Sequence, residues 1–439
     1  MKKTISSWPR LAALVLAAAV TAPLTSLAQD PVTELQPAAL AYEEPPVLRA
    51  ADVLGESLMR GPAHRVQSTA LTDGYMAHFI IDSDYGTFEC VGVDETRQRI
   101  HEVGAIDHLA EVSKSDVFAE AVKKSIEQPI DAAKQVIKHP KEAVKQVPKT
   151  VGHFFKRLGS AIGQAADEIK DRVEERGADE PAPPRESVRK KISDGFKGGI
   201  GFDKAKLECA RQLGVDPYTD NEELQERLDK VAWVYFAGGL PVNVGLAAAS
   251  GGASLAVAAT GILGRPEELF TLTPDELAYR NRESLRALGL PEETQKRFME
   301  TADLPLSHKR AILLALEDLA PAENRAGIVD LALRCHTQDQ VRFLARSLEL
   351  LAARQRSGDA RYTRLVVADR VPAAIEASGA LHVPALVDCI SWTEEAADFA
   401  RRDDLRSQRP VLLLSGQITD RALLGFKENG WTLVRPSAR

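Results

Sequence analysis

The most constraining feature of this sequence is residues 231–264, which contain no Asp, Glu, Lys or Arg in a chain that is 27% charged. A helix that spans a bilayer needs about 20 mainly apolar residues. Val242–Leu263 is long enough, but Pro241 and the pair Gly251-Gly252 are expected to break it into short helices. The stretch therefore predicts a hairpin of two apolar helices.

Two environments suit such a hairpin. On the membrane-insertion scale its Leu, Ile and Val residues contribute only about −2 to −4 kcal/mol, and Asn243 opposes insertion. Small residues recur every fourth position from Ala248 to Ala256, which permits close helix packing. We therefore expect a hairpin buried in a bundle, with a membrane-entering hairpin that contacts lipid through Leu246 and Leu255 as the alternative. In composition, this stretch alone resembles the hairpins of colicin-type pore-forming proteins.

The amino-terminal residues have the pattern of a secretory signal peptide. Lys2 and Lys3 precede an apolar core over 11–20, and small residues end at Ala28. Cleavage after Ala28 removes Lys2, Lys3 and Arg10, so the net charge changes from −7 to −10. The core is not followed by a Cys, so a lipid anchor is not predicted. We expect an acidic, exported, periplasmic protein.

A basic repeat over residues 123–173 is the second candidate for membrane contact. Pro129-Ile130-Asp131-Ala132-Ala133-Lys134-Gln135-Val136 recurs in similar form from Pro140, and a weaker third copy begins at Pro148. Lys123–Arg157 carries nine Lys and Arg against three acidic residues. An amphipathic, cationic segment is typical of contact with an anionic membrane surface. The predicted contacts are Lys134, Lys138, Lys141, Lys145, Lys149, Phe154 and Phe155.

The positive charge of the repeat has other interpretations. It can pair with acidic faces of the same chain, such as 167–175, or simply be solvated. Nucleic acid is disfavoured as a partner because the chain is expected to be exported. Residues 174–192 follow as a polar linker that contains Pro181, Pro183 and Pro184.

The cysteines are widely spaced. Cys90, Cys209, Cys335 and Cys389 form no C-x-x-C pair, which disfavours a zinc site. In an oxidising compartment they allow one or two disulfides, whose pairing the sequence does not choose. The alternative is free thiols that act as small apolar side chains.

The amino-terminal part of the mature chain is expected to begin with an extended lead-in over residues 29–72. Residues 73–122 then predict a β-hairpin, with alternating apolar residues from Tyr75 and a turn at 82–86, followed by a helix after Asp94. Asp82 and Asp84 are interpreted as turn residues, because Gly86 breaks the calcium-loop pattern. The polar side of the helix predicts a solvated surface rather than a metal site; it holds His101, Glu102, Asp107, His108 and Glu111.

Residues 193–357 predict a helical bundle that includes the apolar stretch 231–264. A capping box at Thr273 and Glu276 starts one helix, and Val341, Leu344, Leu348 and Leu351 share one face of another. Residues 358–439 predict a small α/β unit with a buried strand over 411–414.

A ligand site on this α/β unit is the second hypothesis. Ser415 and Gly416 follow the buried strand, where α/β sheets bind ligands. Together with Ser415, His382 and Asp388 are the only candidates that the unit offers. The sequence contains no phosphate-binding glycine motif, no G-x-S-x-G and no H-E-x-x-H. We therefore predict no catalytic, metal-binding or cofactor-binding residue.

These patterns predict an α+β protein that is mainly helical. It has a signal peptide over 1–28, an amino-terminal β-hairpin with a helix, a central bundle with the apolar hairpin, and a carboxyl-terminal α/β unit. The expected function is non-enzymatic association with an anionic membrane surface. The alternatives are an exported enzyme or ligand-binding protein, and a periplasmic scaffold that binds other envelope proteins.

Overall fold

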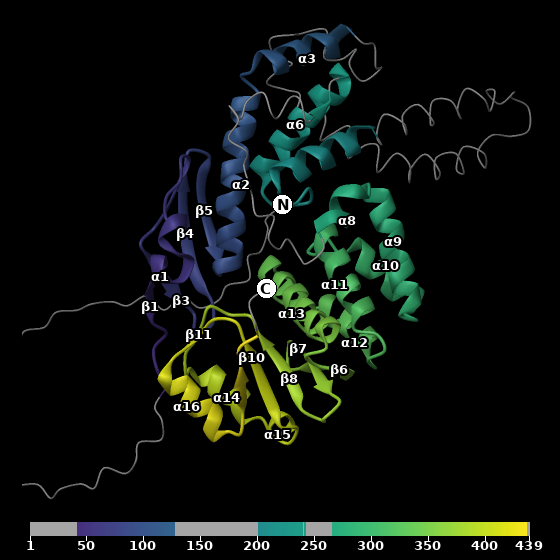
Figure 1. Cartoon of the computed structure of the whole chain (residues 1–439). Coiled ribbons are helices and arrows are strands. Elements are labelled where there is room, and N and C mark those ends of the chain that lie inside the picture. Colours follow the sequence, from purple (N-terminus) through teal and green to yellow (C-terminus); the bar gives the residue numbers. More distant parts are fainter. Residues whose placement is uncertain (1–41, 128–200, 240, 243–265, 437–439) are drawn as a thin grey trace, which may run out of the picture. The chain divides into compact units, whose positions relative to one another are not determined.

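The computed structural model describes residues 42–127, 201–239, 241–242 and 266–436 (Figure 1). These residues belong to one structural unit that begins at Tyr42. Helix exceeds strand in it, and the predicted α+β class is confirmed. The signal peptide, the linker, residues 128–173 of the repeat and residues 243–264 of the apolar stretch lie outside the described residues.

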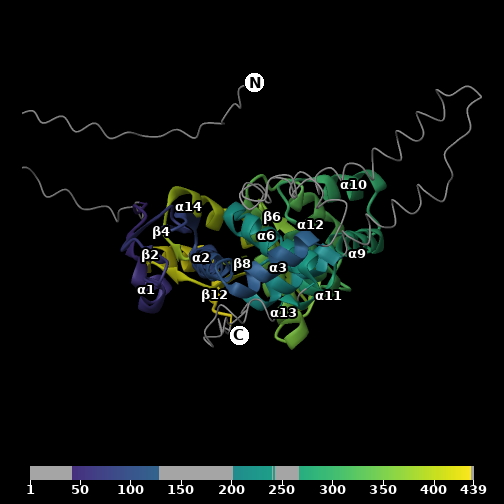
Figure 2. The same cartoon turned by 90° about the horizontal axis from the view of Figure 1, so that it is seen from above.

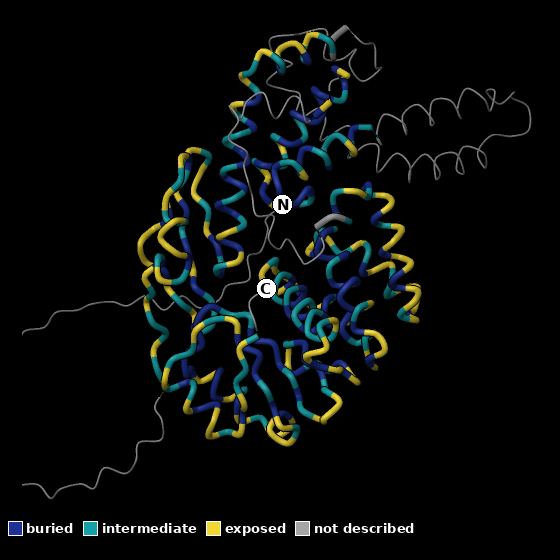
Figure 3. Tube along the Cα trace, viewed as in Figure 1, coloured by how far each residue is buried: buried dark blue, intermediate teal, exposed yellow. Residues whose placement is uncertain are grey.

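An antiparallel sheet occupies the amino-terminal part. Its strand order is β1-β3-β4-β2, and β5 also pairs with β4. The strands are β1 (Val47–Arg49), β2 (His64–Val66), β3 (Thr69–Thr72), β4 (Ala77–Ser83) and β5 (Gly86–Val91). Between β1 and β2 lie helix α1 (Ala50–Leu54) and the 3-10 turn η1 (Glu56–Leu58). Strands β4 and β5 coincide with the predicted alternating segments, and the turn between them is largely exposed (Figure 3).

The predicted extended lead-in over 29–72 is wrong from Val47 onward, because β1, α1, β2 and β3 belong to this sheet. Strands of three or four residues are too short to show a period-two pattern. Val66 and Ala70 are buried in the sheet's core, which is what holds these short strands in place.

Helix α2 (Val93–Val112) connects this sheet to a group of helices. Its first half packs on β4 and β5, and its second half shares a core with α3 (Asp116–Glu127), the helix over 201–213, and α6 (Glu222–Gly238). Figure 2 shows α2 between the amino-terminal strands and α6. Asn221 caps α6, because its side chain accepts a hydrogen bond from the Leu224 N–H.

The beginning of the apolar stretch is part of this core. Val231, Ala232, Val234 and Tyr235 are all buried on α6. Burying these side chains, at about 25 cal/mol per Å² of apolar surface, is the main force that holds α6 against α2 and α3. The part of the apolar stretch that lies on α6, residues 231–238, therefore belongs to the core of the helical group.

Six further helices follow in the described part of the chain. They are α8 (Pro266–Thr271), α9 (Pro274–Ala287), α10 (Glu292–Glu300), α11 (Leu306–Asp318), α12 (Arg325–Ala332) and α13 (Gln338–Ser357). Of these, α12 and α13 pack on the carboxyl-terminal sheet, α11 packs on α13, and α9 packs on α11. The predicted capping box at Thr273 and Glu276 is confirmed. The predicted apolar face of α13 is buried, from Val341 to Leu351.

The carboxyl-terminal sheet has the order β12-β10-β8-β7-β6, in which β12, β10 and β8 are parallel and β7 is antiparallel to its neighbours. The strands are β6 (Tyr362–Ala368), β7 (Val371–Glu376), β8 (Leu381–Ala385), β10 (Pro410–Leu414) and β12 (Thr432–Val434). A two-stranded sheet pairs β9 (Cys389–Ile390) with β11 (Gln417–Ile418). The connecting helices are α14 (Glu394–Arg401), α15 (Asp403–Arg406) and α16 (Asp420–Glu428).

The boundary predicted at residue 357 does not separate two cores. Tyr362, Leu365 and Ala374 of the sheet belong to the same buried cluster as Ile312 of α11 and Leu348 of α13. The helices and the sheet each bury one apolar face, and they bury these faces against one another.

Candidate functional site

The most connected polar site in the described residues lies along α2. Glu95, Arg99 and Glu102 are spaced so that they fall on one side of the helix, and all three are buried. Glu102 is the most deeply buried of them, with 1% of its surface exposed. The expected solvated surface is therefore wrong for Glu102. A buried carboxylate must be paired and hydrogen-bonded, so its partners define the site.

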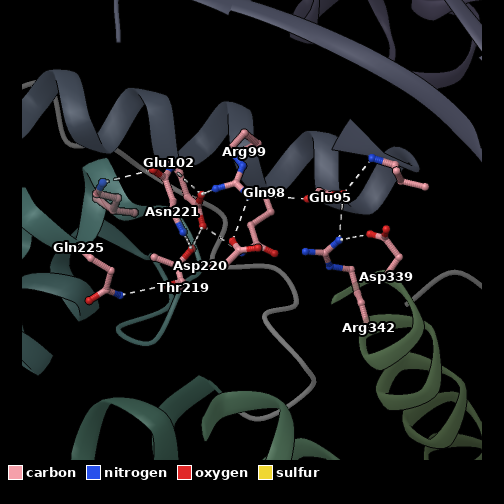
Figure 4. Close-up of polar contacts among 12 residues, drawn as sticks. Glu95, Gln98, Arg99, Glu102, Thr219, Asp220, Asn221, Gln225, Asp339 and Arg342 are labelled. Atoms are coloured by element: carbon pink, nitrogen blue, oxygen red, sulfur yellow. Dashed lines mark hydrogen bonds and ion pairs between the residues drawn. The ribbon is translucent and has the colours of Figure 1, made fainter. Parts of the chain in front are cut away.

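Four donors surround the Glu102 carboxylate (Figure 4). The Thr219 hydroxyl donates at 2.6 Å and the Asn221 amide at 3.0 Å. From α2 itself, the Gln98 amide and the Arg99 guanidinium each donate at 2.9 Å. Thr219 and Asn221 stand just before α6, so this carboxylate joins α2 to the start of α6.

Arg99 extends the site in both directions along α2. Its guanidinium lies 3.0 Å from Asp220 and 3.6 Å from Glu95. Glu95 in turn accepts from the Val91 N–H at 2.8 Å and lies 3.1 Å from Arg342 of α13. Arg342 also lies 3.4 Å from Asp339 (Figure 4). The site is thus a chain of alternating charges that links α2, residues 219–221 and α13.

Two buried titratable groups stand beside this chain of charges. His308, at the start of α11, is 9% exposed. Burial and the charge of Arg342 lower the pKa of His308 to about 4, against the opposing effect of Asp220. Burial raises the pKa of Asp216 to about 6, against hydrogen bonds from the Ser307 side chain and the Tyr218 N–H. Both groups are therefore close to neutral between about pH 4 and 6.

The contribution of His308 to the free energy of unfolding should depend on pH. Because its pKa is lower in the folded state than the ordinary 6.5, its contribution is full above pH 6.5 and is lost as pH falls from 6.5 to 4. Relative to His308→Gln, we expect the wild-type protein to lose about 2–3 kcal/mol between pH 7.5 and 4.5. Urea unfolding at the two pH values measures this difference.

The comparison of wild type with Asp216→Asn should show the opposite pH dependence. The raised pKa of Asp216 means that the folded state binds its proton more tightly, so acidification from pH 7.5 should stabilise wild type relative to Asp216→Asn. If His308→Gln and wild type differ by the same free energy at pH 7.5 and 4.5, the account of His308 is wrong.

The residues considered for a metal site are held apart in other contacts. The His101 ring bonds with the Leu213 carbonyl at 2.8 Å, and Asp107 accepts from the Tyr85 hydroxyl at 2.6 Å. Glu111 pairs with Lys114 on the exposed side of α2. Within the described ranges, no group of three or more His, Cys, Asp or Glu side chains is arranged to hold a metal ion.

Asp388, one of the three candidates on the α/β unit, caps a helix instead of facing a ligand. Its two carboxylate oxygens accept from the Ala77 N–H at 2.9 Å and the Val93 N–H at 3.1 Å. Gly92 precedes α2 with a φ of 89°, a conformation that favours glycine, and has no side chain to cap the helix. Asp388 supplies the missing acceptor from 295 residues away.

His382 and Ser415 are not brought together. Val411 of β10 stands opposite His382, so Ser415 lies four residues further, about 13 Å along the strands. His382 bonds with the Tyr362 hydroxyl at 3.2 Å, and burial lowers its pKa. The Ser415 hydroxyl lies 3.3 Å from the Ala385 carbonyl, to which it donates.

The carboxyl ends of the parallel strands are covered by the chain itself. The N–H groups of Asp388 and Cys389 donate to the Tyr75 carbonyl, and that of Ser391 donates to the Gly74 carbonyl. A Cβ on Gly416 would lie 2.0 Å from the Val387 carbonyl oxygen, so the backbones touch there. In other α/β sheets ligands bind at the carboxyl ends of the strands. Here residues 74–75 and the closely packed backbones at Gly416 occupy this position.

The cysteines are buried free thiols, and no disulfide joins them. Cys90, Cys209 and Cys335 belong to three different apolar clusters, which keeps their sulfur atoms apart. Burial raises the pKa of each thiol, and of Cys389. Their arrangement matches the alternative in which they act as small apolar side chains.

The predicted membrane-contact residues lie outside the described residues; they are Lys134, Lys138, Lys141, Lys145, Lys149, Phe154, Phe155, Leu246 and Leu255. Among the helices that are described, none is both long enough and apolar enough to pass through a bilayer.

Sequence reasoning missed the partners in the Glu102 site, although one signal was present. Glu102 stands one turn before Ile106 and seven residues before Leu109, so it lies on the apolar side of α2. A carboxylate at such a position indicates a buried polar contact.

Comparisons with protein-family models, with curated proteins and with solved structures find no match to this chain.

Proposed function

We propose that this chain is an exported, non-enzymatic cell-envelope protein that associates with an anionic membrane surface. The contacts are made by the basic repeat of residues 123–173 and by the apolar residues that follow α6. One structural observation supports this function: the two segments are attached to neighbouring helices.

Both segments start from the same end of one pair of helices. Phe118 of α3 contacts Tyr235 of α6, with ring centroids 6.1 Å apart. Three residues further on each helix, Gly238 lies against Ala121, where an added Cβ would be 2.6 Å from the carbonyl oxygen. The two contacts advance in the same direction, so α3 and α6 run parallel and their carboxyl ends lie together.

The basic repeat begins within α3, at Lys123, and continues past the end of this helix at Glu127. The apolar stretch begins within α6, at Val231, and continues past its end at Gly238. The chain also returns near this point, because a Cβ on Gly201 would be 2.3 Å from the Phe236 ring. A cationic segment and an apolar segment attached at one place can reach the same membrane surface. Cations supply attraction to anionic lipid, and apolar residues supply insertion.

The charge of the remaining chain supports this assignment. The whole chain has a net charge of −7, so its other surfaces are on balance repelled by anionic lipid. Each Lys or Arg close to such a surface contributes about 1 kcal/mol. The enzyme alternative receives less support, because Asp388, His382 and Ser415 each have a separate structural contact.

Flotation with vesicles that contain phosphatidylserine tests the proposal. We expect the mature protein to float, and a variant in which Lys134, Lys138, Lys141, Lys145 and Lys149 are changed to Glu to remain in solution. The change removes about 5 kcal/mol of attraction, a shift of more than a thousandfold in partitioning. High salt should weaken binding of the wild type, because the attraction is electrostatic.

A matched variant reverses the same number of exposed cations elsewhere, at Arg280, Arg282, Lys296, Arg297 and Lys427. This variant has the same net charge but an intact repeat, so it should float like the wild type. Equal flotation of all three proteins, or of none, removes the membrane hypothesis and favours a periplasmic scaffold.

A further inference from the structure

The described residues on either side of positions 128–200 form two stretches of chain, 42–127 and 201–436 without 240 and 243–265, and the two stretches share one apolar core. The first stretch contributes Ile106, Leu109 and Val112 of α2 and Phe118 of α3 to this core. The second contributes Phe202, Leu213, Leu228 and Tyr235. Because the two sets of side chains bury one another, separating the stretches would expose large apolar surfaces to water.

The Glu102 site also joins the two stretches of chain. Thr219, Asp220 and Asn221 of the second stretch bond to Arg99 and Glu102 of the first. A desolvated carboxylate that loses such donors is left without compensation for its burial. The polar contacts therefore oppose separation in addition to the apolar ones.

A third set of contacts joins the two stretches far from this core. Asp388 holds the N–H groups of Ala77 and Val93, and Arg342 pairs with Glu95. In addition, the backbones of Glu43 and Trp392 are hydrogen-bonded at 3.0 Å. The first stretch is thus attached to the second at both ends of α2.

We propose that residues 42–127 form a docking module that binds residues 201–436 as a permanent non-covalent partner. The two stretches then remain together when the peptide chain between residues 127 and 201 is cut. An extensive apolar core is typical of obligate subunit interfaces, which are stable without a covalent link. The protein can therefore exist as a two-chain form after proteolysis.

The test uses the full mature chain. A recognition sequence for a site-specific protease is inserted between Asp179 and Glu180, and the folded, purified protein is cut to completion. Under native conditions both fragments should elute together from a gel-filtration column, and they should separate only in denaturant. Separate elution under native conditions overturns the proposal.

Two variants of the cut protein test whether the Glu102 site stabilises the interface between the fragments. Glu102→Gln removes the charge and one acceptor oxygen, and we expect the fragments to dissociate at least about tenfold faster. Asp94→Asn removes a largely exposed partner of Arg346, and the rate should change by less than about twofold. Equal rates for the two variants contradict the role given to the Glu102 site.

The wild-type cut decides the proposal even if Glu102→Gln does not fold. Mixing cut protein with an excess of the labelled amino-terminal fragment then distinguishes a permanent partner from an exchanging one. Incorporation of label within minutes contradicts a permanent interface. Neither readout involves lipid, so failure here and failure of membrane association are separate results.

Discussion

Replacing Glu102 with alanine should lower the free energy of unfolding by about 3–5 kcal/mol, because it breaks a buried ion pair by removing one partner. The Asn221 amide would stay buried without its acceptor, and the Arg99 guanidinium would lose one of its three carboxylate partners. The Thr219 hydroxyl would lose a bond of 2.6 Å. Urea unfolding followed by circular dichroism measures the change.

Glu111→Ala is a matched control, because it removes the same side chain from the same helix. Glu111 pairs with Lys114 while both side chains are more than half exposed. Pairs of this kind contribute little, so this variant should lose less than about 1 kcal/mol. If the two variants are destabilised equally, the buried network does not stabilise the junction between α2 and α6.

Replacing Asp388 with alanine should lower the free energy of unfolding by about 2–4 kcal/mol. The buried N–H of Ala77 and the partly buried N–H of Val93 would lose their acceptors, and α2 would lose the carboxylate at its amino end. Asp388→Asn keeps one acceptor oxygen and should lose about half as much. Thermal unfolding monitored by circular dichroism ranks the variants.

Asp403→Ala removes a fully exposed carboxylate from the same part of the chain and should have almost no effect. Hydrogen exchange adds a positional readout. In Asp388→Ala, the amides at the start of α2 should exchange faster, whereas those of α13 should keep their protection. Uniform loss of protection over both helices would contradict the assignment of Asp388 as a local cap.

Features that depend on neighbouring residues were predictable from the sequence. The capping box at Thr273, the alternation in β4 and β5, and the apolar face of α13 each follow from contacts within one or two turns or strands. Local spacing carries the information for such features, because the side chains that matter are close in sequence.

Features that depend on distant residues were not predictable. The short strands β1, β2 and β3 acquire their stability from the sheet and not from their own pattern. Two of the donors to Glu102, Thr219 and Asn221, lie more than 100 residues away in the sequence, so the residues around Glu102 do not identify them. The shared core of α13 and the carboxyl-terminal sheet likewise removes a boundary that composition predicted at residue 357.

The cap that Asp388 places on α2 has a consequence for the order of events during synthesis. Translation produces the first sheet and α2 early, but the acceptor for Ala77 and Val93 is made about 300 residues later. In a nascent chain the start of α2 therefore lacks this acceptor until Asp388 has been synthesised and has left the ribosome. A truncation that removes Asp388 should consequently destabilise the start of α2 and the adjacent strand β4.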